Sequence, residues 1–498
     1  MFQIGPPSPF ALLDPDMTKR ASSRGIALGL GLLLISGCAR RPDTDPRMVS
    51  EWAHSLYGAV RVERLSPPVA SRLLAYAMTG LYSGMSAAKP ELPSLSGKLN
   101  GLAELPKGEA GTRYDPTLSA IAAERLILDS LFRDGLATTR AALGRLADSL
   151  TGARITTGVS ESERARSEAL GERVGLAIVA WAHGDGFDST RGRKYVPPVG
   201  PGLWVNDSPV PTYASQSVSG VSMAVDPTNP TAALRPGAAS DRNLILDRQK
   251  RLVPTLPAVN MAGVTEPYWG HNRPFAIAAW DACPVPPPPA YSPTPGTPLY
   301  EEAREVYETG KKLTPEQKTI TLYWADNGGE SGTPAGHWLS IAGQMVSERR
   351  LSGDQAARLM AETSVSMADA FIAVWGYKFK FNSIRPRTFI RAAIDPTWEP
   401  AIPTPPFPEY LSGHSTLSGA AAGTLTSLLG GAPFHDSTSV SIGHAVRTFD
   451  SFRAAADEAG QSRIYGGIHY RSANIEGGKL GRCVAQRVHE KFPEALAR

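Results

Sequence analysis

Apolar residues recur at three- and four-residue intervals over most of this chain, and this spacing limits the possible folds more than any other feature. Residues 67–85 show the pattern after two opening prolines. Residues 115–132 repeat it behind Asp115, a candidate N-cap, with Pro116 at the first helical position. Strand-type alternation is scarce, and no internal repeat is evident. The sequence therefore predicts an all-α protein.

The composition changes along the chain and suggests three regions. From about residue 185 to residue 298, proline, glycine and polar residues dominate and end in the run PVPPPPAYSPTPGTP. Such a composition favours extended loops and polyproline II segments. Helical periodicity then resumes. We expect a signal segment at 1–38, an N-terminal helical half with a proline-rich segment at 39–298, and a C-terminal helical bundle at 299–498.

Residues 1–38 have the pattern of an export signal. A basic start precedes an apolar run of roughly a dozen residues, which is too short for a permanent membrane span. The run ends in Ile35-Ser36-Gly37-Cys38, which resembles a bacterial lipobox and implies cleavage before Cys38 and lipidation of its thiol. An ordinary secretory signal with a chance cysteine is the alternative. We expect export across the inner membrane and a lipid-anchored envelope protein, in the outer membrane or periplasm.

The charge and the apolar runs of the chain exclude some kinds of partner, and the cysteines leave one question open. The formal charge of +4 is small for 498 residues, and no basic run occurs, which argues against nucleic acid binding. No later apolar run approaches the length of a membrane span, so we expect membrane contact only through the N-terminal lipid. Cys283 and Cys483 could pair in an oxidising compartment, but their positions alone do not decide this.

Three short segments carry the chemistry, and the first is WGYKFKFNSIRP. Lys378 and Arg385 lie seven residues apart, and Pro386 follows the arginine directly. An ammonium point charge and a planar guanidinium fork held close together suit a tetrahedral oxyanion. The alternative is structural, because cations near a helix end often interact with the helix dipole and solvent.

The second segment is Ser412-Gly413-His414. It follows a stiff proline-rich loop and opens a run of small residues that we expect to be a helix. Free backbone N–H groups at a helix start form a natural anion site, and Gly413 would allow close approach. Ser412 could instead be only the N-cap. A serine nucleophile is disfavoured, because the chain lacks a Gly-X-Ser-X-Gly elbow.

The third segment contains Arg463 and His469. The turn Gly466-Gly467 between them could direct both side chains toward one point. A structural arginine and a surface histidine are the alternative.

In this order the three segments, spanning about 378–474, resemble the superfamily that unites vanadium-dependent haloperoxidases, type 2 phosphatidic acid phosphatases and bacterial acid phosphatases. A weaker resemblance to secreted bacterial haloperoxidase-like proteins covers most of the mature chain, including YWADNGGESGTPAGHW and WGHNRPFAI. The resemblance implies a fold like that of vanadium chloroperoxidase: two packed helix bundles with long Pro/Gly-rich loops and a site at one end of the C-terminal bundle.

The resemblance also implies roles for the matching residues. The equatorial oxygens of vanadate or phosphate would be held by Lys378, Arg385, Ser412, Arg463 and the backbone N–H of Gly413. His469 would bind the vanadium of a peroxidase or attack the phosphorus of a phosphate ester. His414 would be the general acid–base. One cradle can serve both chemistries, because vanadate and the phosphoryl transition state share a trigonal-bipyramidal geometry.

Two positions depart from the pattern of the superfamily. Leu411 replaces the usual proline before Ser-Gly-His. Ala473 replaces the acidic residue expected four positions after His469. Either Asn474 or Glu476 takes over the orientation of a site histidine, or that histidine is less well poised. Asp326 is our candidate partner for an oxyanion-binding arginine.

Trp375 and Phe407 match aromatic residues that flank the vanadate and halide site of chloroperoxidase-like members, although core packing is the alternative for each. The resemblance therefore favours a vanadium-dependent haloperoxidase. Such an enzyme would oxidise halide with hydrogen peroxide at vanadate bound by His469, with Lys378 polarising the bound oxidant and a small organic molecule as acceptor. The alternatives are a metal-independent acid phosphatase that forms a phosphohistidine from a phosphate ester, and a non-catalytic surface protein that binds oxyanions. The halide, the organic substrate and the oligomeric state stay open.

Overall fold

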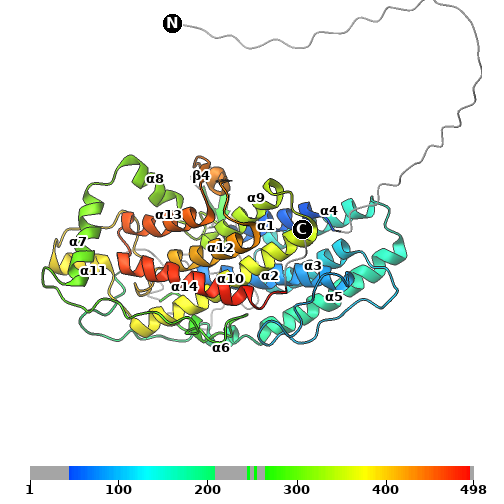
Figure 1. Ribbon diagram of the computed structural model, residues 1–498, viewed down its shortest axis with the longest axis horizontal. Coiled ribbons are helices and arrows are strands. Elements are labelled where there is room, and N and C mark those ends of the chain that lie inside the picture. The colour runs from blue at the N-terminus through cyan, green and yellow to red at the C-terminus, as the bar shows by residue number, and fades with distance from the viewer. Residues whose placement is uncertain (1–43, 208–243, 247–251, 255–263, 494–498) are drawn as a thin grey trace, which may run out of the picture. The chain divides into compact units, whose positions relative to one another are not determined.

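The computed structural model describes residues 44–207, 244–246, 252–254 and 264–493, so the expected signal segment and Cys38 lie outside the described residues. Helices make up most of the described chain (Figure 1), and the all-α prediction is confirmed. The described residues belong to one compact unit, which contains both of the expected helical halves.

The N-terminal half is built mainly from long helices. Asp115 accepts a hydrogen bond from the Leu118 N–H and Pro116 takes the first helical position, as the sequence predicted. The helices of this half are α1 (Pro46–Val62), α2 (Pro67–Ala88), α3 (Pro116–Leu131), α4 (Ala137–Ile155), α5 (Glu161–His183) and the short α6 (Phe187–Thr190).

The C-terminal half contains the longest helix, α10, which ends where Asn382 adopts a left-handed backbone conformation. Its α-helices are α7 (Pro298–Lys311), α8 (Pro315–Tyr323), α9 (Thr333–Glu348), α10 (Gly353–Phe381), α11 (Pro386–Ala393), α12 (Gly413–Leu429), α13 (Phe452–Tyr465) and α14 (Arg471–His489). Two 3₁₀ turns, η2 (Trp269–His271) and η3 (Thr438–Ile442), complete the described helical elements.

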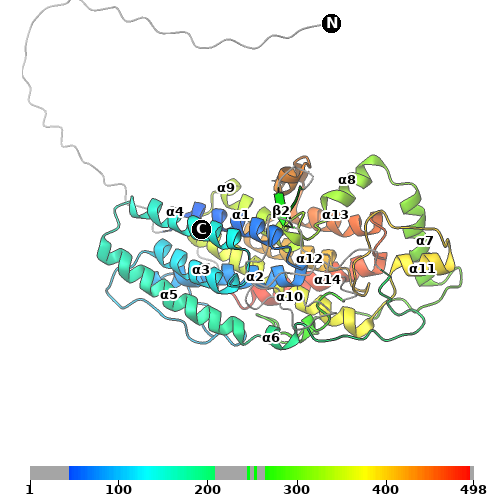
Figure 2. The same ribbon diagram turned by 180° about the vertical axis from the view of Figure 1, so that it is seen from behind.

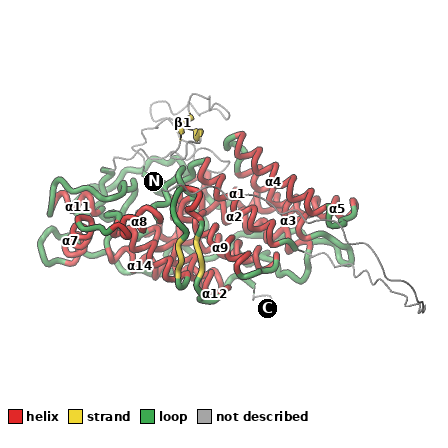
Figure 3. The backbone as a smooth tube through the Cα atoms, turned by 90° about the horizontal axis from the view of Figure 1, so that it is seen from above, coloured by secondary structure: helices red, strands yellow, loops and turns green. Residues whose placement is uncertain are grey.

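Strands are short and local (Figure 3). β1 (Leu244–Leu246) pairs antiparallel with β2 (Leu252–Pro254), and Ile245 lies opposite Val253. β3 (Phe434–Asp436) pairs antiparallel with β4 (Arg447–Phe449), and His435 lies opposite Thr448. The second pair matters for the site, because β3 ends at the buried Asp436.

The two halves share one apolar core. Helix α2 packs against α3 and α5 on one side and against α10 on the other (Figures 1 and 2). Because partners cover α2 on all sides, every residue from Pro68 to Ala88 is buried. In the C-terminal half, α12 packs against α10, α13 and α14. Helix α10 therefore connects the N-terminal helices to the bundle that contains the three motifs.

Two long-range links tie the segment of residues 275–283 to helices α10 and α14. Asp369 on α10 accepts hydrogen bonds from the backbone N–H groups of Phe275, Ala276 and Ile277, and burial raises the pKa of this carboxyl to about 6. A disulfide joins Cys283 to Cys483, which answers the pairing question that the sequence left open. Across the described ranges we find no helix with the length and apolarity that a bilayer span requires.

Candidate functional site

The start of α12 is built as an anion-binding helix terminus. Ser412 is the N-cap, and its Oγ accepts a hydrogen bond from the Ser415 N–H at 3.3 Å, which is the structural role that the sequence left open as an alternative. The Ser412 N–H donates to the Ala473 carbonyl, which ties the helix start to α14. Ser412 Oγ also accepts the Ser415 hydroxyl at 3.0 Å, so its own proton is available for a ligand as far as the described residues show. The first N–H groups of a helix have no partner within the helix and can bind an anion.

Lys378 is completely buried and holds the loop that leads into α12. Its Nζ donates to the carbonyl oxygens of Pro408 and Glu409, both at 2.9 Å, and to that of Leu411. Burial, reinforced by the charge of Arg385, holds the pKa of Lys378 well below its usual range. Lys378 thus lies at the predicted site, with its three donors directed to the loop carbonyls.

Arg385 is also completely buried and contributes one unused donor. Its Nε donates to the Phe407 carbonyl at 2.9 Å and its Nη1 to the Ile468 carbonyl at 2.8 Å. Its Nη2 has no partner among the described residues, although it is buried. An unpaired buried guanidinium nitrogen is costly, so this atom points to a missing acceptor.

His469 is oriented by Glu409. The His469 Nδ1 lies 2.7 Å from Glu409 Oε1, and this oxygen also accepts the Tyr470 N–H at 3.1 Å. An oxygen that accepts a backbone N–H acts as an acceptor, so we place the proton of His469 on Nδ1. The Nε2 then carries a lone pair, 3.3 Å from the Nη1 of Arg385. Burial, together with the charges of Arg385 and Lys378, lowers the pKa of His469 and favours this neutral form.

The sequence did not identify Glu409, and our expectation that Asn474 or Glu476 would orient this histidine was wrong. Asn474 instead hydrogen-bonds to Ser415 and to the Gly460 carbonyl. Glu476 forms an ion pair with Lys479 on the same helix. The carboxylate comes from the loop before α12 instead of α14, and a charged residue within the apolar approach PFPEYLSGH was the available signal.

His414 presents an unpaired nitrogen to the site. It hydrogen-bonds to the Trp324 backbone, and because its Nε2 has no partner among the described residues, the contact belongs to Nδ1. The Trp324 N–H is used within α8, so the acceptor is the Trp324 carbonyl. Burial and the charges of Arg463 and His337 lower the pKa of His414 well below its usual value. His414 is therefore a neutral base with Nε2 as its free acceptor.

Arg463 is held from the opposite wall. Its Nη2 donates to the carbonyls of Thr321 and Trp324, and its Nε donates to Ser462 Oγ at 2.9 Å. Burial lowers the pKa of Arg463 to about 10, and the charge of Asp326 opposes this shift. Our prediction that Asp326 pairs directly with an arginine was wrong, because its Oδ1 lies 2.9 Å from His337 Nδ1.

These residues surround a cavity of about 190 Å³. Its apolar wall includes Trp375 and Phe407, whose ring centroids are 5.0 Å apart. The N-terminal half contributes residues 65–67. Of the residues that the sequence predicted, seven line the cavity: Asp326, Trp375, Phe407, Gly413, His414, Arg463 and His469. Lys378, Arg385 and Ser412 are not in the lining, but Lys378 and Arg385 donate hydrogen bonds to the loop that forms it. Ser412 directly precedes the lining residues Gly413 and His414.

The donor set fits an oxyanion such as vanadate. Arg385 Nη2 and His414 Nε2 are buried and have no partner within the described part of the chain, and the side chains of Lys378, Arg385 and Arg463 are buried cations. The lone pair of His469 Nε2, 3.3 Å from Arg385 Nη1, could serve as an imidazole ligand to such a group. No cluster of three or more His, Cys, Asp or Glu side chains arranged for a metal ion occurs among the residues that the structure describes.

Comparison with known proteins gives a consistent result. Residues 358–497 match the family model of the VCPO second helical-bundle domain. Vanadium chloroperoxidase from Curvularia inaequalis is 29% identical over 222 residues, which cover 32% of this chain and only 36% of that enzyme.

Solved structures extend the likeness over most of the chain. A bacterial vanadium-dependent iodoperoxidase superposes with a TM-score of 0.71 at 31% identity, covering 90% of this chain and 97% of the iodoperoxidase. A holo-type bacterial vanadium-dependent chloroperoxidase shares the fold, with a TM-score of 0.58 at 15% identity, over 86% of this chain and 93% of that one. The fold, the motif order and this near-complete alignment place the chain in the vanadium-dependent haloperoxidase family.

Proposed function

We propose that this protein is a vanadium-dependent haloperoxidase that oxidises a halide with hydrogen peroxide. The observation that carries the proposal is a pair of buried nitrogens, Arg385 Nη2 and His414 Nε2, that have no partner among the described residues, together with the lone pair of His469 Nε2. Arg385 Nη2 lacks an acceptor and His414 Nε2 lacks a donor, and a bound vanadate with a protonated oxygen would provide both. The lone pair of His469 Nε2, which contacts Arg385 Nη1 at 3.3 Å, would bind its Lewis-acidic centre.

The roles follow from the contacts of the residues. His469 Nε2 would bind the vanadium, while Glu409 keeps the proton on Nδ1 and raises the basicity of the ring. Arg385 Nη2, Arg463, the Ser412 hydroxyl and the Gly413 N–H would hold the oxygens. Lys378 adds positive charge and fixes the loop that leads to the helix start. Bound vanadate supplies a Lewis-acidic centre for hydrogen peroxide.

Proton transfer falls to His414. Its neutral ring, with Nδ1–H donated to the Trp324 carbonyl, leaves Nε2 free to take a proton from hydrogen peroxide and to return one later. Trp375 and Phe407 form an apolar wall beside the cradle, which limits water and leaves room for a weakly hydrated halide.

The test is reconstitution of the purified protein with orthovanadate. In the presence of hydrogen peroxide we expect oxidation of iodide to triiodide and bromination of monochlorodimedone, both dependent on vanadate. His469→Ala should reduce both activities to background. His489→Ala is the matched control, because His489 pairs with Glu362 near the end of α14, and it should retain activity.

Two results would contradict the proposal. Hydrolysis of p-nitrophenyl phosphate with inhibition by vanadate, and no halide oxidation, would make the protein a phosphatase of the same superfamily. Vanadate binding with neither activity would make it a non-catalytic oxyanion-binding protein.

A further inference from the structure

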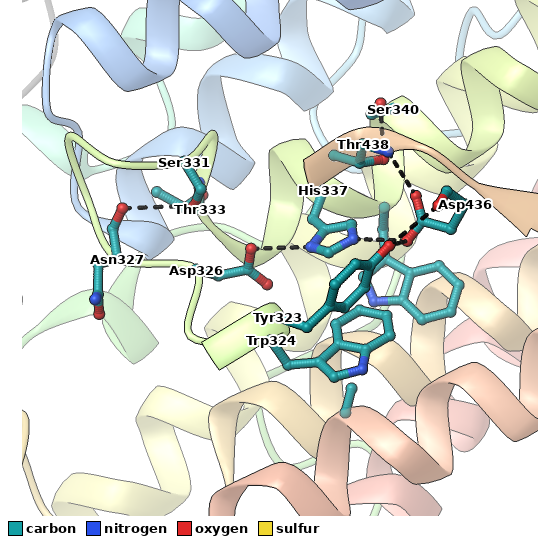
Figure 4. A network of polar contacts seen from close by, with 12 residues as sticks. Tyr323, Trp324, Asp326, Asn327, Ser331, Thr333, His337, Ser340, Asp436 and Thr438 are labelled. Atoms are coloured by element: carbon teal, nitrogen blue, oxygen red, sulfur yellow. Dashed lines mark hydrogen bonds and ion pairs between the residues drawn. The ribbon is translucent and has the colours of Figure 1, made fainter. Parts of the chain in front are cut away.

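His337 on α9 lies between two carboxylates behind the wall of the site. Its Nδ1 is 2.9 Å from Asp326 Oδ1, and its Nε2 is 2.8 Å from Asp436 Oδ2 (Figure 4). All three side chains are buried. Ionised carboxylates only accept hydrogen bonds, so both ring nitrogens donate and the imidazole is cationic. Burial alone would lower the pKa of His337, but the two carboxylates raise it to about 10. We call this group the 326–337–436 triad.

Neighbouring groups donate hydrogen bonds to Asp436, the carboxylate of the triad that does not line the cavity. Tyr323 donates its hydroxyl to Asp436 Oδ2 at 2.7 Å, and the Thr438 N–H donates to Asp436 Oδ1 at 2.9 Å (Figure 4). Asp326, which lines the cavity, has fewer hydrogen bonds, because its Oδ2 has no partner among the described residues. Asp436 is therefore a fixed anchor on β3, and His337 connects it to the loop that begins after α8.

His337 also holds that loop at a second point. Its ring stacks on the indole of Trp324, with centroids 4.6 Å apart and planes at 18°. Asp326 adopts a φ of 48°, and Thr333 at the other end of the loop adopts 62°. Such left-handed conformations are uncommon outside glycine and persist only where the surroundings enforce them. The contacts of His337 with residues 324 and 326 are therefore restraints on a strained segment.

The same segment supplies the acceptor that orients two site residues. The Trp324 carbonyl accepts hydrogen bonds from Arg463 Nη2 and from His414 Nδ1. Any rotation of the peptide that follows Trp324 would move this oxygen away from both. The proton of His414 could then move to Nε2, where it would block the free acceptor.

We propose that His337 is a positioning residue of this site: through Asp326 and the Trp324 ring it holds the Trp324 carbonyl, which orients Arg463 and selects the Nδ1–H tautomer of His414. Stability alone does not account for the triad, since burying three charges costs desolvation that apolar side chains of similar size would avoid. The kinetic consequence rests on the function proposed above, whereas the tautomer of His414 does not.

The closing experiment reads the tautomer in vanadate-free protein. Long-range ¹H–¹⁵N spectra of protein labelled at histidine distinguish protonated from unprotonated ring nitrogens, and His414→Ala assigns the signal of His414. We expect wild type to show a protonated Nδ1 and an unprotonated Nε2. His337→Gln, confirmed as folded by circular dichroism, should show a substantial Nε2–H population. His489→Gln, which breaks another histidine–carboxylate contact of the C-terminal half, should match wild type.

A second readout follows the oxyanion and the reaction. His337→Gln should weaken vanadate binding in calorimetry and lower kcat for halide oxidation about 10–100-fold, with KM for hydrogen peroxide nearly unchanged. A folded His337→Gln protein with wild-type tautomer and vanadate affinity would overturn the inference. If that variant does not fold, Asp326→Asn is the test, because it leaves His337 and Asp436 as one buried pair of opposite charges. An unchanged His414 tautomer in Asp326→Asn would overturn the inference. Failure of the proposed function alone would remove only the kcat readout.

Discussion

At the scale of single residues, the site depends on which acceptors are bound by the N–H groups of each cationic side chain. Lys378 directs its donors to loop carbonyls, and Arg463 holds the carbonyls at the end of α8. Arg385 donates from Nε and Nη1 to the Phe407 and Ile468 carbonyls, and its Nη2 has no partner in the part of the chain that the structure describes. A guanidinium can bind two fixed carbonyls and still face a ligand, whereas an ammonium presents one point charge.

We therefore expect Arg385→Lys to preserve the charge of the site but weaken vanadate binding about 10–100-fold, which is about 1.4–3 kcal/mol. Isothermal titration calorimetry on the folded variant measures this loss. The matched control is Arg387→Lys, two residues further on, where the side chain pairs with Asp207 and Glu399 outside the cavity. Equal affinities of Arg385→Lys and wild type would show that charge alone matters at this position.

At the scale of elements, the helix start that carries Ser412 and Gly413 is held by close packing of α12 on α14. A Cβ at Gly481 would lie 1.9 Å from the Thr416 carbonyl oxygen, and one at Gly419 would lie 2.7 Å from the Gly478 carbonyl oxygen. These are backbone contacts that no side-chain rotation can relieve. Glycine therefore sets the distance between the two helices, and through it the position of the anion-binding terminus.

Gly481→Ala should force α14 away from α12, destabilise the protein by about 1–3 kcal/mol and lower vanadate affinity. Denaturant unfolding and calorimetry measure the two effects. Gly144→Ala is the control, because a Cβ there meets nothing within 4 Å and the residue lies within α4. That substitution should stabilise the protein by about 0.5–1 kcal/mol. Similar losses in both variants would contradict the packing explanation.

At the scale of the whole molecule, the site needs both halves of the chain. Residues 65–67 line the cavity together with the three motifs, and the disulfide Cys283–Cys483 ties the central loop to α14 across 200 residues of sequence. Closing so long a loop restricts the unfolded chain more than the folded one. The disulfide therefore stabilises the folded protein, although its two cysteines are not among the residues that line the cavity.

The double variant Cys283→Ser/Cys483→Ser should lose about 2–5 kcal/mol of stability and melt a few degrees lower than wild type. Wild type in reducing agent should show the same shift in a thermal melt followed by circular dichroism. At 25 °C the variant should still bind vanadate, because the cystine is not part of the cavity lining. An unchanged melting temperature would mean that the unfolded chain is already restricted by other means.

Local signals in the sequence predicted much of this organisation. The helices at 67–85 and 115–132 were found by periodicity, and the caps Asp115 and Ser412 were found by residue type and position. Contacts between distant residues were not found. Glu409 meets His469 across 60 positions, and Asp436 meets His337 across 99. A short-range pattern holds no information about such partners.

The sequence by itself determined the helical class and the residues able to bind an oxyanion, because periodicity, caps and the three motifs are written within single segments. Only the tertiary structure decided which carboxylate orients His469 and which side chain pairs with Asp326. It also decided which buried nitrogens of the site have no partner among the described residues. The physical reason is that hydrogen-bond satisfaction is a property of the packed whole. A buried donor is known to be free only after every neighbour has been placed around it.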